Sequence, residues 1–247
     1  MKRLLLSMLV AVATSSASAE EAPVSSIPKH LQLARELVAT VTPENNLYNI
    51  RPSKVPIRWK GDLFTSENAV STHCVGLVDA VLDRADSPTP KAVKRNTSWQ
   101  YAVRVNNYFE ASKKGLGLTH IESLNDVRPG DLFMFSCKDI CTTLAGDTAQ
   151  GHITFINAAP RKAVKELPPV IAGTTQWFVE VIDSSDAPHG PTDTRVMPKG
   201  TKFATGIGIG IYRIYTDESG VPVGYAGERA KKFFPIEQRQ IELSRPL

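Results

Sequence analysis

The hydrophobic periodicity of the chain changes near residue 128, and this change constrains the fold more than any other feature of the sequence. Before it, apolar residues recur at the spacing of amphipathic helices. After it, short apolar runs are separated by turn residues, as in strands. We expect helices over about 28–41, 74–86 and 99–114, and strands over 132–135, 152–156, 177–182, 206–215 and 221–225. Helices followed by consecutive strands predict an α+β domain with a mostly antiparallel sheet.

Three stretches lack a clear period. Residues 44–71 are rich in Pro, Asn and Gly, which predicts an ordered loop. A second loop is expected over about 136–150, between the first two strands. The charged segment after Tyr225 is expected to form a peripheral tail with one short helix.

The first 19 residues have the pattern of a secretory signal peptide: a basic start, an apolar run and small residues ending at Ala19. We expect residues 1–19 to be removed, and residues 20–247 to form a single domain, with an N-terminal helix and a C-terminal hairpin extension, in the periplasm or outside the cell. No later stretch approaches the roughly 20 apolar residues of a membrane-spanning helix, so no transmembrane segment is expected in the mature chain. The formal charge falls from +4 to +2 when Lys2 and Arg3 are lost, too little to indicate a nucleic-acid partner.

The chain has three cysteines, and in an oxidising compartment an odd number leaves at least one thiol unpaired. Cys137 and Cys141, in the phrase CKDIC, are close enough to form a small disulfide loop, which would leave Cys74 free. The alternative is a zinc site of three cysteines and a histidine, for which a single CxxxC is a weak pattern. We therefore predict a disulfide between Cys137 and Cys141, no metal and no cofactor.

Cys74 lies at the predicted start of an amphipathic helix. The unpaired N–H groups and the positive end of the helix dipole at that position favour the thiolate, which is the nucleophilic form of cysteine. Gly76 leaves space for another element or a substrate to approach the helix end. A cysteine at a helix start can also be a small buried hydrophobic residue.

Four phrases follow one another along the chain: HCVGLV, RPGDLFMF, GHITFI and FVEVIDSS. Their succession resembles the NlpC-type cysteine peptidases of bacterial cell walls, a branch of the papain-like fold, over about residues 59–185. The resemblance implies a papain-like domain in which the helix that bears the cysteine packs on the sheet. It also implies that Cys74 is the nucleophile, His152 the base and Asp183 the group that orients the imidazole.

The resemblance extends to substrate-binding residues, with departures. Trp59 lies where the family has a tyrosine beside the substrate, which implies a pocket wall. The acid that precedes the cysteine in the family is His73 here, and the serine that follows it is Val75. His73 is a candidate for substrate binding or for a second base, although its place at the helix start is expected to point it away from the thiol. The family's third residue, usually a histidine, is Asp183, which also orients an imidazole well.

The implied function is an exported thiol hydrolase that cleaves an amide or peptide bond, in peptidoglycan stem peptides, through an acyl-enzyme on Cys74. The alternatives are a catalytically inactive domain that binds the cell wall or an envelope protein, and a lipid amide hydrolase or acyltransferase. Residue types alone also allow simpler roles: His152 as a hydrogen-bonded core histidine, and Asp183 as the start of a turn. His189, in Ala-Pro-His-Gly-Pro, is expected to be a loop residue, and the alternative is that it lines the site.

Overall fold

The computed structural model describes residues 26–51, 55–62, 65–95, 104–142, 148–197 and 202–247, with only the backbone course given for the strand residues between 138 and 150. The expected signal peptide, residues 1–19, lies outside the described residues. Within these residues, none of the helices is both long and apolar enough to cross a membrane.

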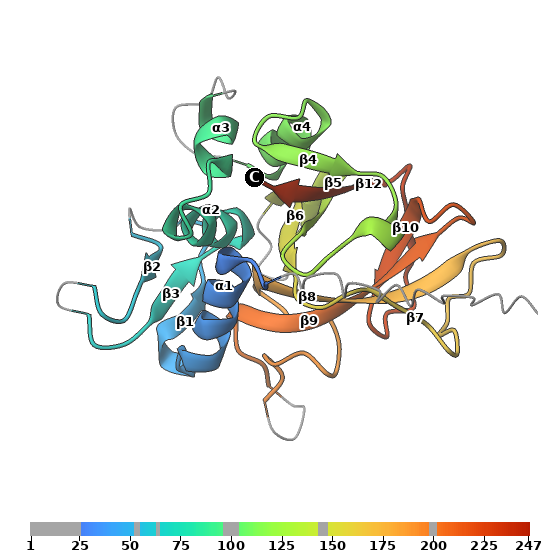
Figure 1. The fold of residues 1–247 in the computed structure, drawn as a ribbon. Helices are drawn as coiled ribbons and strands as arrows, with labels where there is room; N and C mark the ends of the chain where they lie inside the picture. The colour runs from blue at the N-terminus through green and yellow to red at the C-terminus, as the bar shows by residue number, and fades with distance from the viewer. Residues whose placement is uncertain (1–25, 52–54, 63–64, 96–103, 143–147, 198–201) are drawn as a thin grey trace, which may run out of the picture.

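The described helices lie where the sequence period predicts them, with one addition; residues 99–103, the start of the third predicted helix, lie outside the described residues. Their bounds are α1 Lys29–Thr40, α2 Cys74–Arg84, α3 Thr89–Arg95 and α4 Val105–Lys113, with short 3-10 turns at Pro43–Asn45 and Leu124–Asp126. α1, α2 and α3 lie together at one side of the molecule (Figure 1). α3 was not expected, because Pro88 and Pro90 indicate a break. Pro90 falls in its first turn, where a missing N–H costs no hydrogen bond.

A small three-stranded sheet occupies the region that was expected to be a loop. Its strands are β1 Asn46–Tyr48, β2 Ile57–Arg58 and β3 Ala69–Thr72, with β3 in the middle. β1 runs parallel to β3, and β2 runs antiparallel to it. These strands are too short to give a clear period in the sequence. The last of them leads directly into α2, so β3 fixes the place where Cys74 begins its helix.

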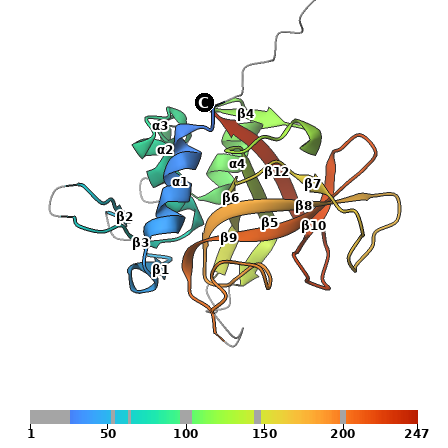
Figure 2. The same ribbon diagram turned by 60° about the horizontal axis from the view of Figure 1, so that its bottom comes forward.

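The large sheet is antiparallel in every described pairing. Its strands are β4 Leu118–Ile121, β5 Leu132–Thr142, β6 Thr148–Ile156, β7 Arg161–Lys162, β8 Thr175–Ser185, β9 Gly206–Thr216, β10 Pro222–Gly227, β11 Phe234–Pro235 and β12 Arg239–Pro246. The order is β11-β10-β9-β8-β6-β5-β12-β4, with β7 paired to β8. The long β8–β9 pair curves from the helical side to the far side of the molecule (Figure 2).

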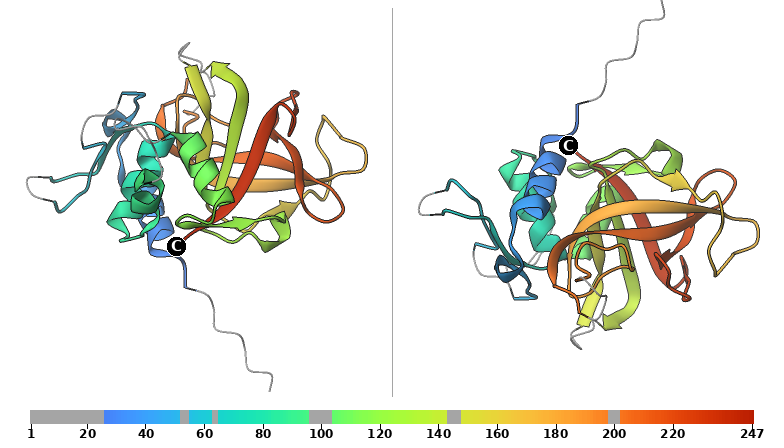
Figure 3. Two further views of the ribbon diagram at one scale, coloured as in Figure 1. Left: turned by 90° about the horizontal axis from the view of Figure 1, so that it is seen from above. Right: turned by 90° about the horizontal axis from the view of Figure 1, so that it is seen from below.

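The two faces of the sheet bury two separate apolar cores, because successive strand residues point to opposite faces. Leu132, Met134 and Phe155 face the helices and join a core that includes most of α2. Phe133 and Phe135 point the other way, into a second core enclosed by the curved sheet itself. The helices therefore cover only one side, as Figure 3 shows from above and below.

The papain-like fold class is wrong for this chain. Four helices stand beside a nine-stranded antiparallel sheet that provides the framework of the described structure. The expectation of a peripheral C-terminal tail is also wrong. The C-terminal segment forms β12, which pairs with both β5 and β4 and is therefore an interior strand of the large sheet. The expected loop over 136–150 is mostly strand, because β5 and β6 continue well past the apolar runs that identify them.

Candidate active site

Cys74 occupies the first position of α2 and is 7% exposed. The residue before it, His73, is the N-cap: its backbone is extended, and its Nδ1 accepts a hydrogen bond from the N–H of Gly76 at 3.3 Å. The preceding Ser71 and Thr72 are residue types that cap helices more often, but the cap here is the histidine. The first intrahelical bond joins the N–H of Leu77 to the His73 carbonyl. The N–H groups of Cys74 and Val75 precede that bond and lie at the positive end of the helix.

The Cys74 thiol contacts two imidazoles. His152, from β6, and the neighbouring His73 both lie close enough to the thiol to interact with it electrostatically. The expectation that His73 points away from the thiol is therefore wrong. Since Nδ1 of His73 accepts a bond from Gly76, the proton of a neutral His73 ring is on Nε2.

The pKa values of Cys74 and His152 are shifted in opposite directions. Burial alone would raise the pKa of the Cys74 thiol, but the His152 charge and the hydrogen bonds from His152 and His73 lower it to about 6. Burial alone would lower the pKa of His152, but Cys74 and Asp183 raise it to about 10. Each group favours the charged form of the other, so between these pH values the pair is a thiolate and an imidazolium.

Asp183 lies near the end of β8 and is completely buried. Its Oδ2 accepts a short hydrogen bond from Nε2 of His152, which leaves Nδ1 of that ring for the thiol. Burial would raise the pKa of Asp183, but Arg195, His189 and His152 hold it well below its usual range. The carboxylate is therefore ionised and fixes the orientation of His152. We expected Asp183 to close the strand, whereas β8 continues to Ser185.

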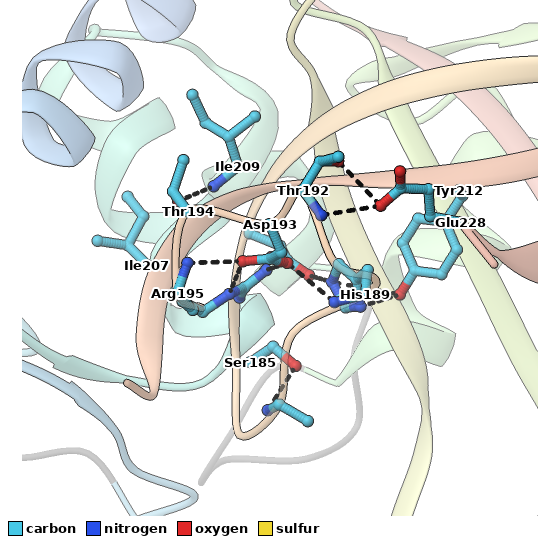
Figure 4. Close-up of polar contacts among 12 residues, drawn as sticks. Ser185, His189, Thr192, Asp193, Thr194, Arg195, Ile207, Ile209, Tyr212 and Glu228 are labelled. Carbon is cyan, nitrogen blue, oxygen red and sulfur yellow. Dashed lines mark hydrogen bonds and ion pairs between the residues drawn. The ribbon is translucent and has the colours of Figure 1, made fainter. Parts of the chain in front are cut away.

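Three residues of the connection between β8 and β9 complete the site, and their contacts with Asp183 and with one another were not predicted from the sequence (Figure 4). His189 donates from Nε2 to the same Asp183 oxygen at 2.5 Å. Arg195 Nη1 lies 2.9 Å from Asp183 Oδ1. Asp193 binds Arg195 through both of its oxygens, at 2.8 and 2.7 Å. Asp183 is thus surrounded by donors from β6 and from the connection.

Glycines on β9 provide the space for this group. The run from Gly206 to Ile211 alternates Gly and Ile, so one face of the strand carries no side chains. A Cβ on Gly210 would lie 2.5 Å from Asp193 Oδ2 and 2.8 Å from His189 Cδ2, and one on Gly208 would lie 2.8 Å from Arg195 Nε. Asp183 lies directly opposite Gly208 in the β8–β9 register. The alternation of Gly and Ile is the one signal in the sequence that another element packs against this face.

The same residues include a set of ligand types for a metal ion. His152, Asp183 and His189 place one donor atom each within 4.8 Å of one another. Two ligand atoms of a tetrahedral zinc ion would be about 3.3 Å apart, given bonds of roughly 2.0–2.1 Å. The 2.5 Å between His189 Nε2 and Asp183 Oδ2 is shorter than that and fits a direct hydrogen bond. Arg195 also places a positive charge against the same carboxylate. The arrangement therefore fits a hydrogen-bonded network better than a metal site.

The remaining predicted residues lie elsewhere. Trp59 packs in the core beneath Arg84, whose guanidinium lies 5.5 Å from the ring centroid. Arg84 ends the helix that Cys74 begins, roughly 15 Å away along the axis, so the structure does not bring Trp59 to the thiol. Cys137 is disulfide-bonded and Cys74 is free, while the Cys141 side chain lies outside the described ones.

The site thus brings together a cysteine from a helix start, a histidine that interacts with it electrostatically, and an aspartate hydrogen-bonded to that histidine, the last two from separate strands. Comparison with known proteins adds little to that description. No family model matches the chain, and no solved structure matches it. A protein of Acanthamoeba polyphaga mimivirus, named Uncharacterized protein R653, is 28% identical over 209 residues, which cover 83% of this chain and 89% of the viral protein. The likeness to NlpC-type peptidases remains a prediction from four short phrases.

Proposed function

We propose that this protein is a thiol hydrolase that cleaves an amide bond through an acyl-enzyme on Cys74. The observation that carries the proposal is the chain from Cys74 through His152 to Asp183, formed by three separate elements. The opposite pKa shifts of Cys74 and His152 supply the nucleophile and the acid that this chemistry needs near neutral pH.

Acylation follows from the positions of these groups. The Cys74 thiolate attacks the carbonyl carbon, a C–S bond forms, and the carbonyl electron pair moves to the oxygen. The N–H groups of Cys74 and Val75 face that negative oxygen. The His152 imidazolium then gives its Nδ1 proton to the amide nitrogen, the C–N bond breaks, and the amine leaves.

Deacylation reverses the proton transfer. Neutral His152 takes a proton from water, whose oxygen attacks the thioester carbon. The C–S bond then breaks, the acid leaves, and the thiolate and imidazolium are restored. Asp183 exchanges no proton in either step; it holds the ring and stabilises its cation.

We propose peptidoglycan stem peptides in the cell envelope as the first substrate to test. The support for this choice is the phrase resemblance and the export pattern of residues 1–19. His73 and Val75, which depart from the family phrase, lie at the nucleophile itself, so the acyl group accepted can differ from that of the family.

The experiment incubates the purified protein with muropeptides and follows products by mass spectrometry. Wild-type protein is expected to release a new amine and to carry a trapped acyl mass on Cys74 after acid quenching. Cys74→Ala should show neither, while a matched variant outside the site, His120→Leu, should keep both. His120, on β4, bonds to Glu242 on the neighbouring β12. The His120→Leu variant therefore shows what the loss of a histidine–carboxylate pair does to the protein when that pair is not in the site. Hydrolysis that persists in Cys74→Ala would refute the proposal, and an inert thiol would favour a binding domain.

A further inference from the structure

One oxygen of Asp183 accepts hydrogen bonds from two imidazoles. Nε2 of His152 and Nε2 of His189 both donate to Oδ2, while Oδ1 faces Arg195. A single orienting carboxylate needs only one of these rings to hold the catalytic base. His189 does not reach the thiol in any described contact, so the site contains a second histidine without an assigned task.

His189 is held as firmly as the catalytic residues. Its backbone N–H donates to Asp193 Oδ2 at 2.9 Å, and its carbonyl accepts from the N–H of Glu228 at 3.0 Å. The ring packs on Tyr212 with centroids 4.5 Å apart, and the Tyr212 hydroxyl lies 3.2 Å from Nδ1. The missing side chain of Gly210 gives it room. The fold therefore fixes this ring against Asp183 from several sides.

Charged and titratable groups surround His189 on every element that packs against it. They are Asp183 on β8, Asp193 and Arg195 on the same connection, Glu228 after β10, Tyr212 on β9, His152 on β6 and, beyond it, Cys74 on α2. Arg195 lies against both acids, so Asp183 stays ionised whether or not His189 donates to it.

We propose that His189 is a positioning residue that shares the Asp183 oxygen with His152 and thereby limits how strongly that carboxylate stabilises the His152 imidazolium. An oxygen that accepts two N–H bonds binds each donor less strongly than an oxygen that accepts one, because its negative charge is divided between them. A less stabilised imidazolium gives up its proton to the leaving amine more readily. This inference rests on the proposed hydrolase, since it assigns His189 a task in that chemistry.

The test measures ionisation of the Cys74 thiol rather than turnover. The rate of iodoacetamide alkylation is recorded between pH 4 and 10 for wild type, His189→Leu and His189→Gln, with Cys74→Ala as the blank for other thiols. Leucine removes the donor, whereas the glutamine amide keeps an N–H near the same place. The midpoint is the pH at which the alkylation rate of Cys74 is half of its maximum. We expect this midpoint to be lower in His189→Leu than in wild type by roughly half a pH unit to one pH unit, the effect of one net hydrogen bond. His189→Gln should stay close to wild type.

Several outcomes would overturn the inference: a midpoint of His189→Leu that is unchanged or raised, or a glutamine variant that shifts as far as the leucine variant. If His189→Leu does not fold, as judged by circular dichroism, His189→Phe replaces it, because its ring keeps the packing on Tyr212 without an N–H donor. The outcomes separate the two proposals. A wild-type midpoint near the ordinary value of about 8.5 would contradict the proposed thiol hydrolase. A midpoint that is lowered in wild type but is the same in the His189 variants would contradict only the role proposed for His189.

Discussion

Ser184 donates a hydrogen bond from Oγ to the backbone carbonyl of Thr72, 2.8 Å away and wholly buried. Ser184 follows the aspartate of the site, and Thr72 comes two residues before its cysteine. The bond therefore joins the two ends of the catalytic chain by a path that does not pass through His152. It fixes the end of β3, and with it the start of α2, against β8.

Ser184→Ala tests that connection. The Thr72 carbonyl keeps its bond from the N–H of Asn49 at 3.0 Å, so it is not left without a partner. We expect a loss of about 1 kcal/mol in the free energy of unfolding, measured in urea. Because the helix start is less well fixed, the alkylation midpoint of Cys74 should rise. A loss of stability with no change in the midpoint would show that the bond only supports the fold.

The pH dependence of alkylation follows from the shifted pKa values. The pKa of Cys74 is lowered to about 6, so the alkylation rate should rise through pH 6 and not near 8.5. The stability from the lowered thiol pKa is present at high pH and is lost as the pH falls through about 6. The stability from the raised His152 pKa is present at low pH and is lost as the pH rises through about 10. Unfolding at a series of pH values should therefore show the benefit of the pair, relative to Cys74→Ala, between these limits.

Asp183→Asn removes the negative charge with little change in shape. The His152 imidazolium loses its main buried counter-charge besides the thiolate, so the Cys74 midpoint should move up towards its ordinary value. Hydrolysis should fall by about 100-fold or more. Asp193→Asn is the control, because Asp193 contacts Arg195 but not His152. Equal effects of the two changes would contradict the assignment of Asp183.

Gly210→Ala tests the space on β9. The added Cβ would lie 2.5 Å from Asp193 Oδ2 and 2.8 Å from His189 Cδ2, so the connection must move. We expect a loss of roughly 1–3 kcal/mol in stability and a changed alkylation profile. Gly224→Ala on β10 is a matched control, since its Cβ would meet the Phe233 ring. It should destabilise the fold while leaving the profile of Cys74 unchanged.

Trp59→Ala separates packing from substrate binding. The ring is buried beneath Arg84 at the far end of α2, so its loss should cost roughly 3–5 kcal/mol of stability. The alkylation midpoint of Cys74 and the KM for any substrate of the folded variant should stay near those of wild type. A large rise in KM without a loss of stability would return Trp59 to the pocket wall.

Local patterns predicted the elements with a strong period. Leu31, Ala34 and Leu37 marked α1 and are all fully buried in it. The apolar runs after residue 205 marked β9 and β10, and the two strands pair as an antiparallel hairpin. These predictions succeeded because neighbouring residues determine them.

Long-range pairing was not predictable in the same way. The segment from Arg239 to Pro246 is rich in charged and polar residues and reads as surface, yet Glu242 and Ser244 are buried in it. Glu242 is tolerated there because Ser112 and His120, more than a hundred residues earlier, both bond to it. A single sequence does not indicate such partners, so the interior position of β12 was missed.

The candidate site shows the same division. The helix start and the Gly-His phrase drew attention to Cys74 and His152 because each has a local signal. His189, Asp193 and Arg195 lie in a connection whose composition indicates only a loop. These residues matter because they contact Asp183, directly or through one another, once the chain has folded. No pattern of neighbouring residues in the sequence indicates such a contact.

The glycine face of β9 has a consequence for recognising related chains. From Asp183 to Gly210 the spacing of the residues in this cluster is D-x5-H-x3-D-x-R-x12-G-x-G. Each fixed letter is required by volume or charge in one buried cluster, so they are expected to be kept or lost together. A genome search for this spacing selects chains that have the residues around Asp183, whether or not they have a cysteine at the position of Cys74. It would thus separate descendants that still carry the thiol from those that have kept the cluster and given up the chemistry.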